Sequence, residues 1–544
     1  MDSIGGDLKG MSPRPFETEQ LDAMRAIGTV RAYAPGQTIL QVGERVDRFL
    51  LVLEGEVEVV HPITGERLVP STLAPGQFLG ELNFLNGGSN TLAMRAAAET
   101  ELLEIPRIPM LELMAKSPEI GDHVLTVFAA RRRLQVEEGR SALTVIGADR
   151  DPAVQRVASF LSRNRIPFHE VSAPEALREG VHVDGLRETG SAVVSGASGV
   201  IEDPTPRKIA ALLGLDIEIN EAEQLDLLIV GGGPAGVAAA VYAGSEGLRA
   251  LVIEDSAIGG QAGTSSRIEN YMGFPTGISG ADLVYRGQVQ AMKFGTRFAM
   301  PRRVIGLART ADGFCATLDD GSALCARAVL VATGVQYSRL PIDRLEEFEG
   351  AGVYYAATEM EARFCRQTEA VVVGGGNSAG QAAMYISRSA HHVHLLVRGS
   401  SLSATMSAYL RDRLEADPRI TIHYGTRLSA LEGGPRLEAV LVDTESGQRR
   451  IDASALFIMI GAEPNTQWLS GLVELDPKGF VKTGAEAGAA SAYETSCPGI
   501  FAVGDVRSGS VKRVASSVGE GSVVVSAIWS RLDQDERGRR ADNA

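Results

Sequence analysis

Two glycine-rich turns constrain the fold of this chain more than any other feature. The first, G-G-G-P-A-G at 231–236, joins the apolar run L-D-L-L-I-V to an alanine-rich segment, and the second, G-G-G-N-S-A at 374–379, follows E-A-V-V-V. An apolar strand that passes through glycines directly into a helix opens a βαβ unit, whose parallel strands need a helical crossover. The sequence therefore predicts an α/β fold with two Rossmann-like units.

The first turn carries the glycine spacing of a dinucleotide site. Gly231 allows the tight turn, Gly233 lets the backbone approach a pyrophosphate, and Gly236 lets the helix lie close to the strand. The N–H groups at the start of that helix face the bound anion. Glu254 ends the next apolar run, about twenty residues later, where a carboxylate accepts from a ribose 2′-hydroxyl. We favour a dinucleotide site over a purely structural turn.

The second turn has the same plan but a different residue after the next apolar run. Gly374, Gly376 and Ala379 occupy the spacing, and the run H-H-V-H-L-L-V ends at Arg398 without an acid. A guanidinium suits a 2′-phosphate, which a carboxylate would repel. We therefore expect FAD at the first turn and NADPH at the second. The alternative is that Arg398 is an ordinary solvated residue and that NADH serves equally.

The two turns are accompanied by five further segments: G-G-Q (259–261), E-N-Y (269–271), V-A-T-G (331–334), P-G-I-F-A-V-G-D (498–505) and K-R-V-A (512–515). Together they resemble the low-molecular-weight thioredoxin reductase family of FAD/NADPH pyridine nucleotide-disulfide oxidoreductases. The resemblance implies a homodimeric flavoprotein in which hydride passes from NADPH to FAD, whose electrons then reach an acceptor. The implied FAD-binding residues are Gly231, Gly233, Pro234, Ala235, Gly236, Glu254, Gly260, Gln261, Asn270, Thr333, Gly334, Gly504, Asp505, Arg513, Val514 and Ala515. The implied NADPH-binding residues are Gly374, Gly376, Asn377, Ser378, Ala379, Arg398 and Gly461.

The redox cysteines of that family are absent from this sequence. A C-x-x-C pair is expected just upstream of the second glycine turn, and Ala356 and Glu359 stand at the best-matched positions. Neither a methyl group nor a carboxylate can attack a disulfide. No side chain is therefore assigned as catalytic, and we expect electrons to leave the flavin without an internal dithiol. The segment Y-Y-A (354–356) is more similar to ferredoxin-NADP reductases, which share the scaffold and also lack the pair.

The other cysteines receive structural interpretations. Cys315 and Cys325 flank the D-D-G-S turn of a predicted hairpin and could face each other, although strand packing is the plainer explanation. Cys365 is interpreted as a buried or inert thiol. Around Arg398, Gly399 and Ser403 take places that are basic in the family, so discrimination of the 2′-phosphate is expected to be weaker.

Residues 78–96, F-L-G-E-L-N-F-L-N-G-G-S-N-T-L-A-M-R-A, resemble the phosphate-binding cassette of cyclic-nucleotide-binding domains. The resemblance implies a β-barrel domain in which the cassette glutamate accepts from the ribose and backbone N–H groups hold the cyclic phosphate. Asn90 falls where an arginine is expected, so a charge-assisted contact is missing. A retained fold with a lost or altered ligand is at least as good a reading as cyclic AMP binding. The candidate ligand residues are Gly80, Glu81, Leu82, Asn90 and Thr91.

Residues 141–220 change character and follow a β-α-β-β-α order. They resemble a small thioredoxin or glutaredoxin domain, with D-P-A-V at the place of C-x-x-C. Asp151 and Val154 would then replace both cysteines.

A chain of 544 residues is too long for one core. The predicted division is a tail at 1–20, the cyclic-nucleotide-binding-like domain at 21–138, the thioredoxin-like domain at 141–220, the FAD domain at 225–345 and 469–535, the NADPH domain at 346–468 and a tail at 536–544. A competing interpretation makes the chain a ligand-regulated redox sensor or scaffold. We prefer the enzyme, because a dead flavoprotein would have little reason to keep two dinucleotide turns.

Charge and hydropathy exclude several partner classes. The net charge is −15 and no Lys/Arg-rich run stands out, so attraction to nucleic-acid phosphates is missing. The start M-D-S-I-G-G-D-L-K-G lacks a signal-peptide pattern, and no apolar stretch is long enough for a membrane span. The sequence therefore predicts a cytoplasmic protein that binds neither membrane nor nucleic acid. Four scattered cysteines predict neither a disulfide scaffold nor a metal site.

Overall fold

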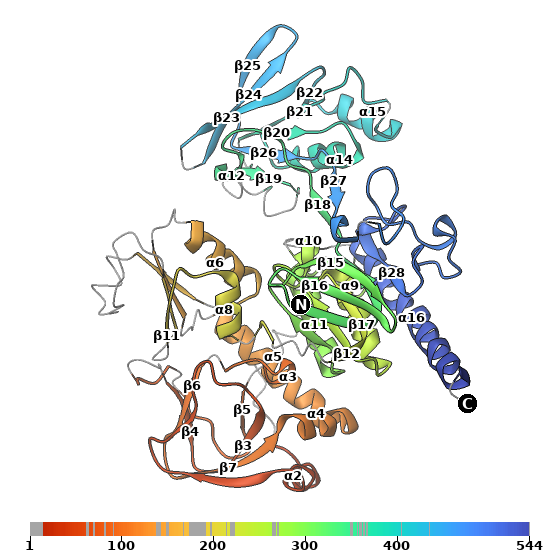
Figure 1. Ribbon diagram of the computed structural model, residues 1–544. Coiled ribbons are helices and arrows are strands. Elements are labelled where there is room, and N and C mark those ends of the chain that lie inside the picture. The colour runs from red at the N-terminus through yellow and green to blue at the C-terminus, as the bar shows by residue number, and fades with distance from the viewer. Residues whose placement is uncertain are drawn as a thin grey trace.

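The computed structural model of the chain describes residues 15–542 except 61–64, 69–70, 81–82, 91, 138–142, 148–151, 167, 173–191, 196–198, 214, 218–222, 264–267, 269–270, 349–351, 356, 358–361, 363–364, 366–367, 404, 435 and 470. In Figure 1 the second Rossmann-like unit lies at the top, the first at the centre right, a small middle domain at the left and an N-terminal domain at the bottom. Among the helices in the described ranges, none is long and apolar enough to cross a lipid bilayer.

The first Rossmann-like unit is built on a mixed sheet of order β14-β13-β12-β17-β16-β15, with β28 beside β17. Strands β12, β13, β14, β17 and β28 pair in parallel, while β15, β16 and β17 form an antiparallel meander. Its elements are β12 (Gln224–Val230), α9 (Pro234–Ser245), β13 (Ala250–Ile253), α10 (Gly260–Gly263), α11 (Gly280–Lys293), β14 (Arg297–Ala299), β15 (Val304–Thr310), β16 (Gly313–Leu318), β17 (Ala323–Val331), β28 (Ile500–Ala502) and α16 (Val514–Asp542).

The second Rossmann-like unit has a parallel sheet of order β19-β26-β20-β21-β22 and an antiparallel sheet of order β23-β24-β25. Its elements are α12 (Leu345–Phe348), β19 (Val353–Tyr354), β20 (Glu369–Val373), α14 (Asn377–Ile386), β21 (His392–Leu396), α15 (Ala408–Ala416), β22 (Ile420–His423), β23 (Arg427–Gly433), β24 (Leu437–Thr444), β25 (Gly447–Asp452) and β26 (Ala455–Ile458).

The two units are joined by a pair of short antiparallel strands, β18 (Val335–Tyr337) and β27 (Ala462–Pro464). Gly334 precedes β18 with φ +61°, and Gly461 precedes β27 with φ +110°. Nothing lies within 4 Å of where a Cβ would stand at either glycine. The crossing is therefore narrow and bordered by residues with unusual backbone freedom.

The N-terminal domain contains two antiparallel sheets, of orders β1-β7-β3-β5 and β2-β6-β4, and the described strands do not close into the expected barrel. Its helix α2 begins at Thr18, inside the segment expected to be a tail. The elements are α2 (Thr18–Arg25), β1 (Thr29–Tyr33), β2 (Thr38–Leu40), β3 (Arg48–Glu54), β4 (Val57–Val60), β5 (Phe78–Leu79), α3 (Asn83–Asn86), β6 (Ala93–Ala96), β7 (Thr100–Pro106), α4 (Arg107–Lys116) and α5 (Pro118–Glu137).

The middle domain has a sheet of order β11-β10-β8-β9, in which β8 and β9 are parallel and the other pairs antiparallel. The order of its described elements is β-α-β-β-β-α, so the sequence-based order missed one strand, β11, whose four residues carry little periodicity. Val154, at a place where cysteine was expected, is fully buried, whereas Asp151 lies outside the described residues. The elements are β8 (Leu143–Ile146), α6 (Pro152–Arg163), β9 (His169–Val171), β10 (Ala192–Ser195), β11 (Gly199–Glu202) and α8 (Pro206–Leu212).

Helices α9 and α16 cross closely at a glycine. A Cβ on Gly521 would lie 2.2 Å from the carbonyl oxygen of Ala235, in the first turn of α9. Gly519, on the same helix α16, has nothing within 4 Å of that position. The first is therefore required for helix contact and the second is not.

We expect Gly521→Ala to lower the free energy of unfolding by about 1–3 kcal/mol, because a backbone oxygen cannot move aside without shifting a helix. The control, Gly519→Ala, should be neutral or stabilise by up to about 1 kcal/mol through its higher helix propensity. Urea unfolding followed by tryptophan fluorescence measures both, since Trp468 and Trp529 are the chain's two tryptophans and lie in or beside the first unit. Equal midpoints for the two variants would contradict the packing argument.

Candidate functional site

A cavity of about 780 Å³ opens where β12 and β17 end in the first Rossmann-like unit. This is the carboxyl edge of parallel strands, where ligands bind in open α/β sheets. Most of the FAD-binding residues expected from the sequence line it: Gly231, Gly233, Pro234, Ala235, Glu254, Gly260, Gln261, Thr333, Gly334, Gly504, Asp505, Arg513 and Val514. The cavity thus gathers segments that are far apart in the chain.

Three expected FAD residues do not line the cavity. Gly236 lies behind it, and a Cβ there would come within 1.9 Å of the Gly231 oxygen, which fits its expected role in helix packing. Ala515 is exposed on the first turn of α16. Asn270 lies outside the described residues.

The glycine turn leaves no room for side chains. Gly231 has φ +108°, and a Cβ there would meet the Ala332 oxygen at 2.4 Å. Gly233 caps α9 and has open space around it, and Pro234 starts the helix with φ already helical. The N-terminus of α9 therefore faces the cavity with free N–H groups and a positive dipole end, as an anionic pyrophosphate requires.

Glu254 is the buried acid of this site. Its carboxylate accepts from the N–H of Gly232 at 2.7 Å, of Ser256 at 3.1 Å and of Ala257 at 3.3 Å. Burial, together with the neighbouring Asp255 carboxylate, raises the pKa of Glu254 to about 8, although the backbone donors act in the opposite direction. The side chain both fixes the glycine turn and presents an acceptor at the cavity wall.

Asp505 supplies a second carboxyl group to the cavity lining. Its Oδ1 is buried with no hydrogen-bond partner in the described structure, which fits a hydroxyl-bearing ligand such as the ribityl chain of FAD. Burial raises the pKa of Asp505, with Lys512 opposing and Glu520 adding to the rise. Glu520 accepts from the Gly504 N–H at 2.7 Å and from Arg507 at 2.6 Å, so it holds the turn that carries Asp505.

Several cavity residues were not expected from the sequence, because no motif marks them. Asn465, Gln467 and Trp468 come from the segment after β27. Thr333 and Asn465 lock the two crossings, with Thr333 Oγ1 donating to the Asn465 carbonyl at 2.9 Å and Asn465 Nδ2 donating back at 3.0 Å. The unexpected cations are Arg163, Arg302 and Arg303, whereas Lys512, which also lines the cavity, is the first residue of the K-R-V-A segment.

The second glycine turn repeats the geometry of the first. Gly374 has φ +147° and a Cβ there would lie 2.4 Å from the Met459 oxygen, while Gly376 caps α14 and a Cβ there would lie 3.9 Å from the Thr405 oxygen. Asn377 accepts from the Ser407 N–H at 2.9 Å, and Ala379 is fully buried under the turn. Ser378 is exposed in the first turn of α14.

A guanidinium that the sequence did not single out lies at the end of β21. Arg411, on α15, donates to Ser403 Oγ at 3.2 Å, and Ser401 Oγ donates to the same oxygen at 3.0 Å. Ser403 occupies a place expected to be basic, and the nearby Arg398 is exposed. The loop after β21 therefore has a second cation beside it, Arg411, which is supplied by the packing of helix α15.

The cassette of the N-terminal domain is described only in part. Glu81, Leu82 and Thr91 lie outside the described residues, and Gly80 has φ +107°. Asn90 is buried, and its side-chain amide donates to the carbonyls of Gln41 (3.3 Å) and Leu92. Its amide hydrogens are therefore used to hold neighbouring loops, whereas an arginine would extend toward a phosphate.

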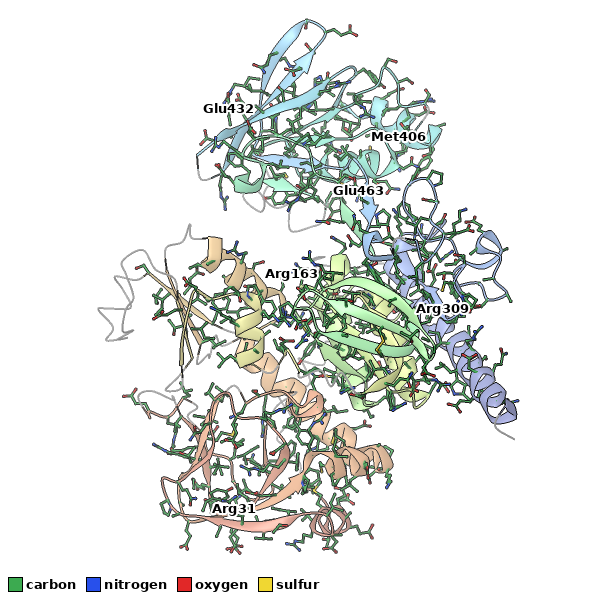
Figure 2. The ribbon with its side chains drawn as sticks, viewed as in Figure 1. Arg31, Arg163, Arg309, Met406, Glu432 and Glu463 are labelled. Carbon is green, nitrogen blue, oxygen red and sulfur yellow. A yellow bond between two sulfur atoms is a disulfide. The ribbon has the colours of Figure 1, made fainter. Side chains whose placement is uncertain are left out.

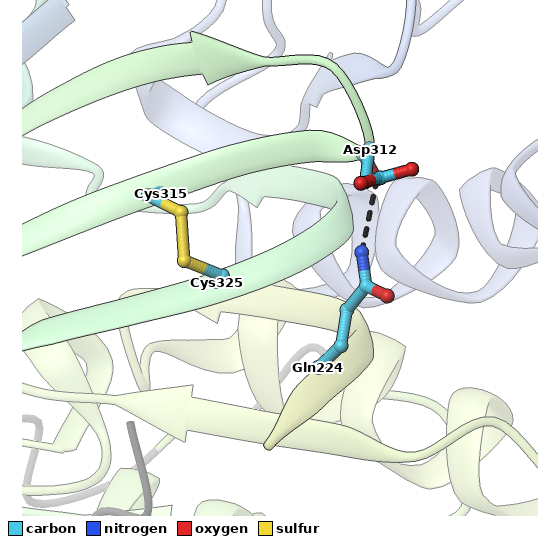
Figure 3. Close-up of a disulfide and its surroundings, with 4 residues drawn as sticks. All are labelled: Gln224, Asp312, Cys315 and Cys325. Atoms are coloured by element: carbon cyan, nitrogen blue, oxygen red, sulfur yellow. Dashed lines mark hydrogen bonds between the residues drawn. A yellow bond between two sulfur atoms is a disulfide. The ribbon is translucent and has the colours of Figure 1, made fainter. Parts of the chain in front are cut away.

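The cysteines take no part in the cavity. Cys315 and Cys325 face each other across β16 and β17 and form a disulfide, where strand packing had been the plainer expectation (Figure 3). From Cys325 to the cavity residue Ala332 the strand rises roughly 23 Å at about 3.3 Å per residue. Cys365 and Cys497 are buried and form no disulfide in the described structure, and burial raises the pKa of Cys497. Among the described residues that line the cavity, none is a cysteine.

Comparison with known proteins agrees with this geometry. Residues 225–521, more than half of the chain, match the family described as pyridine nucleotide-disulphide oxidoreductase. The chain belongs to this family. Residues 30–117 match the cyclic nucleotide-binding domain, so the two modules expected from the motifs are both confirmed. By its family the chain is an FAD-dependent oxidoreductase that uses NADPH.

Individual relatives cover the same part of the chain. The thioredoxin reductase of Streptomyces clavuligerus is 33% identical over 299 residues, 54% of this chain and 90% of the relative. That of Treponema pallidum is 35% identical over 310 residues, 57% of this chain and 97% of the relative. NADPH-dependent thioredoxin reductase 3 of Arabidopsis thaliana is 34% identical over 309 residues, 55% of this chain and 56% of the relative. A crystal structure of Lactococcus lactis thioredoxin reductase aligns with a TM-score of 0.48 and 26% identity, covering 57% of this chain and all of that one.

The raised pKa of Glu254 predicts a pH dependence of stability in the FAD-free protein. Between about pH 4.5 and 8 the folded Glu254 keeps a proton that the unfolded chain has lost. The folded state then binds more protons, so the free energy of unfolding falls as pH rises through this window. Glu254→Gln should reduce that fall by more than about 1 kcal/mol, because glutamine does not titrate.

Urea unfolding at pH 5 and pH 8, followed by tryptophan fluorescence, measures this difference. Glu246→Gln is the matched control, since Glu246 is exposed at the end of α9. An unchanged pH dependence in Glu254→Gln would show that Glu254 is ionised throughout.

Proposed function

We propose that this chain passes electrons from NADPH through FAD to an acceptor that is not reached through an internal dithiol. FAD is assigned to the first Rossmann-like unit (225–345 and 469–535) and NADPH to the second (346–468). The acceptor is a small oxidant such as oxygen or a quinone, or a redox protein. The observation that carries the proposal is a complete dinucleotide cavity without a thiol among its described lining residues.

The cysteine positions support the same conclusion. Ala356 and Glu359 stand where the family carries its pair, and neither can exchange with a disulfide. The Cys315–Cys325 disulfide lies at the far end of β17 from the cavity, and Cys365 and Cys497 are enclosed. Electron transfer to these sulfurs would require a path through the sheet.

The residues of the cavity have distinct roles in this proposal. FAD supplies the two-electron chemistry when bound. The N-terminus of α9 binds the pyrophosphate, Glu254 accepts from the adenosine ribose, and Asp505 accepts from the ribityl chain. Trp468 and Asn465 also line the cavity.

We infer that the two-stranded crossing lets the second Rossmann-like unit rotate relative to the first. Gly334 and Gly461 flank β18 and β27 with positive φ and free space, which allows rotation of the second unit about this link. Rotation would bring the second glycine turn, with Arg398 and Arg411, toward the cavity. Exposed apolar side chains on α9 and α16, including Tyr242, Val523 and Trp529, support a homodimer, which we place in the cytoplasm.

An acceptor panel tests the proposal. We expect NADPH to be oxidised in the presence of oxygen, quinones or ferricyanide, and thioredoxin to be reduced at less than about one hundredth of that rate, because no cavity thiol relays electrons. Absorbance of NADPH and of a thioredoxin-coupled disulfide reagent measures the two rates. Efficient thioredoxin turnover by the unaltered chain would overturn the proposal.

A matched pair of variants sharpens this test. Cys315→Ser/Cys325→Ser should leave all rates within about twofold, since the disulfide is remote from the cavity. If thioredoxin were reduced and this variant abolished the activity, the hairpin disulfide would be the relay.

A second candidate function, regulation by a ligand of the N-terminal domain, is favoured by one contact. Asn86, at the end of α3 in the cassette, donates to the Phe298 carbonyl at 3.1 Å and accepts from the Phe298 N–H at 3.1 Å. Phe298 belongs to β14, and the next residue, Ala299, accepts from the Glu254 N–H at 3.1 Å. A shift of Asn86 would therefore be transmitted through Phe298 and Ala299 to Glu254.

The cassette helix is also tied to the helices that follow it. Arg107, on α4, donates to the carbonyls of Phe84 and Leu85, and Arg131, on α5, donates to those of Phe78 (2.7 Å) and Gly80 (3.2 Å). We propose that a cyclic nucleotide, or another small anion, acts on the cavity by moving this group of residues together.

Asn86→Ala should weaken FAD binding about threefold to tenfold, because it leaves both backbone groups of Phe298 without their partner. It should also remove any change in NADPH oxidation caused by added cyclic AMP. Lys293→Ala is the control at the same interface, where Lys293 pairs with the largely exposed Asp122 at 2.7 Å and should contribute little. FAD titration of each apoprotein measures the FAD affinity of the unaltered chain and of the two variants. Equal affinities would show that the two domains are merely adjacent.

A further inference from the structure

The middle domain reaches into the cavity of its neighbour. Arg163, the last residue of α6, lines the cavity together with Glu254, Asp255 and Ser256 of the first Rossmann-like unit. Figure 2 labels Arg163 at the junction of these two parts of the molecule. A domain with no cysteine at its expected redox positions therefore still contributes a cation to the candidate FAD site.

The position of Arg163 is fixed by the residues that follow it. Asn164 Nδ2 donates to the Ser256 carbonyl at 3.3 Å. Arg165 Nη1 donates to Asp282 Oδ1 at 2.7 Å, and its guanidinium lies 5.4 Å from the centre of the Tyr285 ring. These contacts hold the end of α6 against the rim of the cavity.

A second set of contacts anchors the other end of the middle domain. Asp216 accepts from Arg302, which also donates to the Ile217 carbonyl at 3.3 Å. The Met300 N–H donates to the Leu215 carbonyl at 3.3 Å. Ile217 is buried in the core of the first unit. The docking is thus broad, and one side chain can be changed without releasing the domain.

The glycine turn and the acid that follows it indicate which part of FAD would lie near Arg163. In a dinucleotide site the acid after the second strand marks the adenosine ribose, and this acid is Glu254. Asn164 bonds the backbone two residues beyond Glu254, so Arg163 stands at the adenosine end. The buried guanidinium of Arg302 donates hydrogen bonds to Asp216, to the Ile217 carbonyl and to Asp320. Arg163, in contrast, is exposed at the rim.

We propose that Arg163 of the middle domain binds the adenosine 5′-phosphate half of FAD. The inference rests on the assignment of FAD to this cavity. A guanidinium can stack on the adenine and donate to phosphate or ribose oxygens, so it closes the open side of the cavity over the adenosine. The middle domain is thereby a part of the cofactor site.

The test measures FAD affinity of the full-length apoprotein by quenching of Trp468, which also lines the cavity. Arg163→Ala should raise the FAD dissociation constant about tenfold, and Arg163→Lys should fall between it and the unaltered chain. The control is Arg156→Ala, an exposed arginine on the same helix that does not line the cavity, which should stay within about twofold.

Urea unfolding of each apoprotein separates ligand contact from docking. An Arg163→Ala midpoint equal to that of Arg156→Ala, with the tenfold loss of FAD affinity, supports the proposal. FAD affinity within twofold of the unaltered chain overturns it, and so does a loss matched by a lower midpoint, which would make Arg163 a docking residue. An unaltered apoprotein that binds no FAD would instead refute the assignment of the cavity.

Discussion

The site depends on the hydrogen bonds that the side-chain carboxyl group of Glu254 accepts. It accepts backbone N–H groups from the glycine turn and from the loop after β13, so one buried side chain fixes two walls of the cavity. The Glu254 N–H donates to the Ala299 carbonyl of β14, and the Glu254 carbonyl accepts from the N–H of Arg302, which follows β14.

This arrangement explains how three domains can share one cofactor site. The first Rossmann-like unit supplies the turn and the acid, the middle domain supplies Arg163, and the N-terminal domain holds β14 through Asn86. The second unit is joined to the first through the paired strands β18 and β27.

Sequence patterns predicted the local geometry of the site well. Gly231, Gly236 and Gly374 were expected to allow close backbone approaches, and an added Cβ at each would clash. Glu254 and Asp505, both expected from the motifs to bind FAD, line the same cavity. The glycine positions could be predicted because each turn is formed by residues close together in the sequence, so their spacing indicates the turn.

Long-range contacts could not be predicted in the same way. Asn86 and Phe298, or Asn164 and Ser256, meet only after separate domains have docked, and no periodicity marks them. Arg411 reaches Ser403 through the packing of α15, and the pairing of Cys315 with Cys325 depends on the register of β16 and β17. The four residues of β11 are too few to show a strand pattern.

Strand β14 is the edge of the sheet of the first unit, and such an edge normally exposes unpaired backbone groups to other chains. Phe298 pairs by register with Val252 of β13, and its own N–H and C=O are both taken by the amide of Asn86. A single side chain from another domain therefore ends the sheet. The same bond that links two domains also protects the molecule from edge-to-edge aggregation.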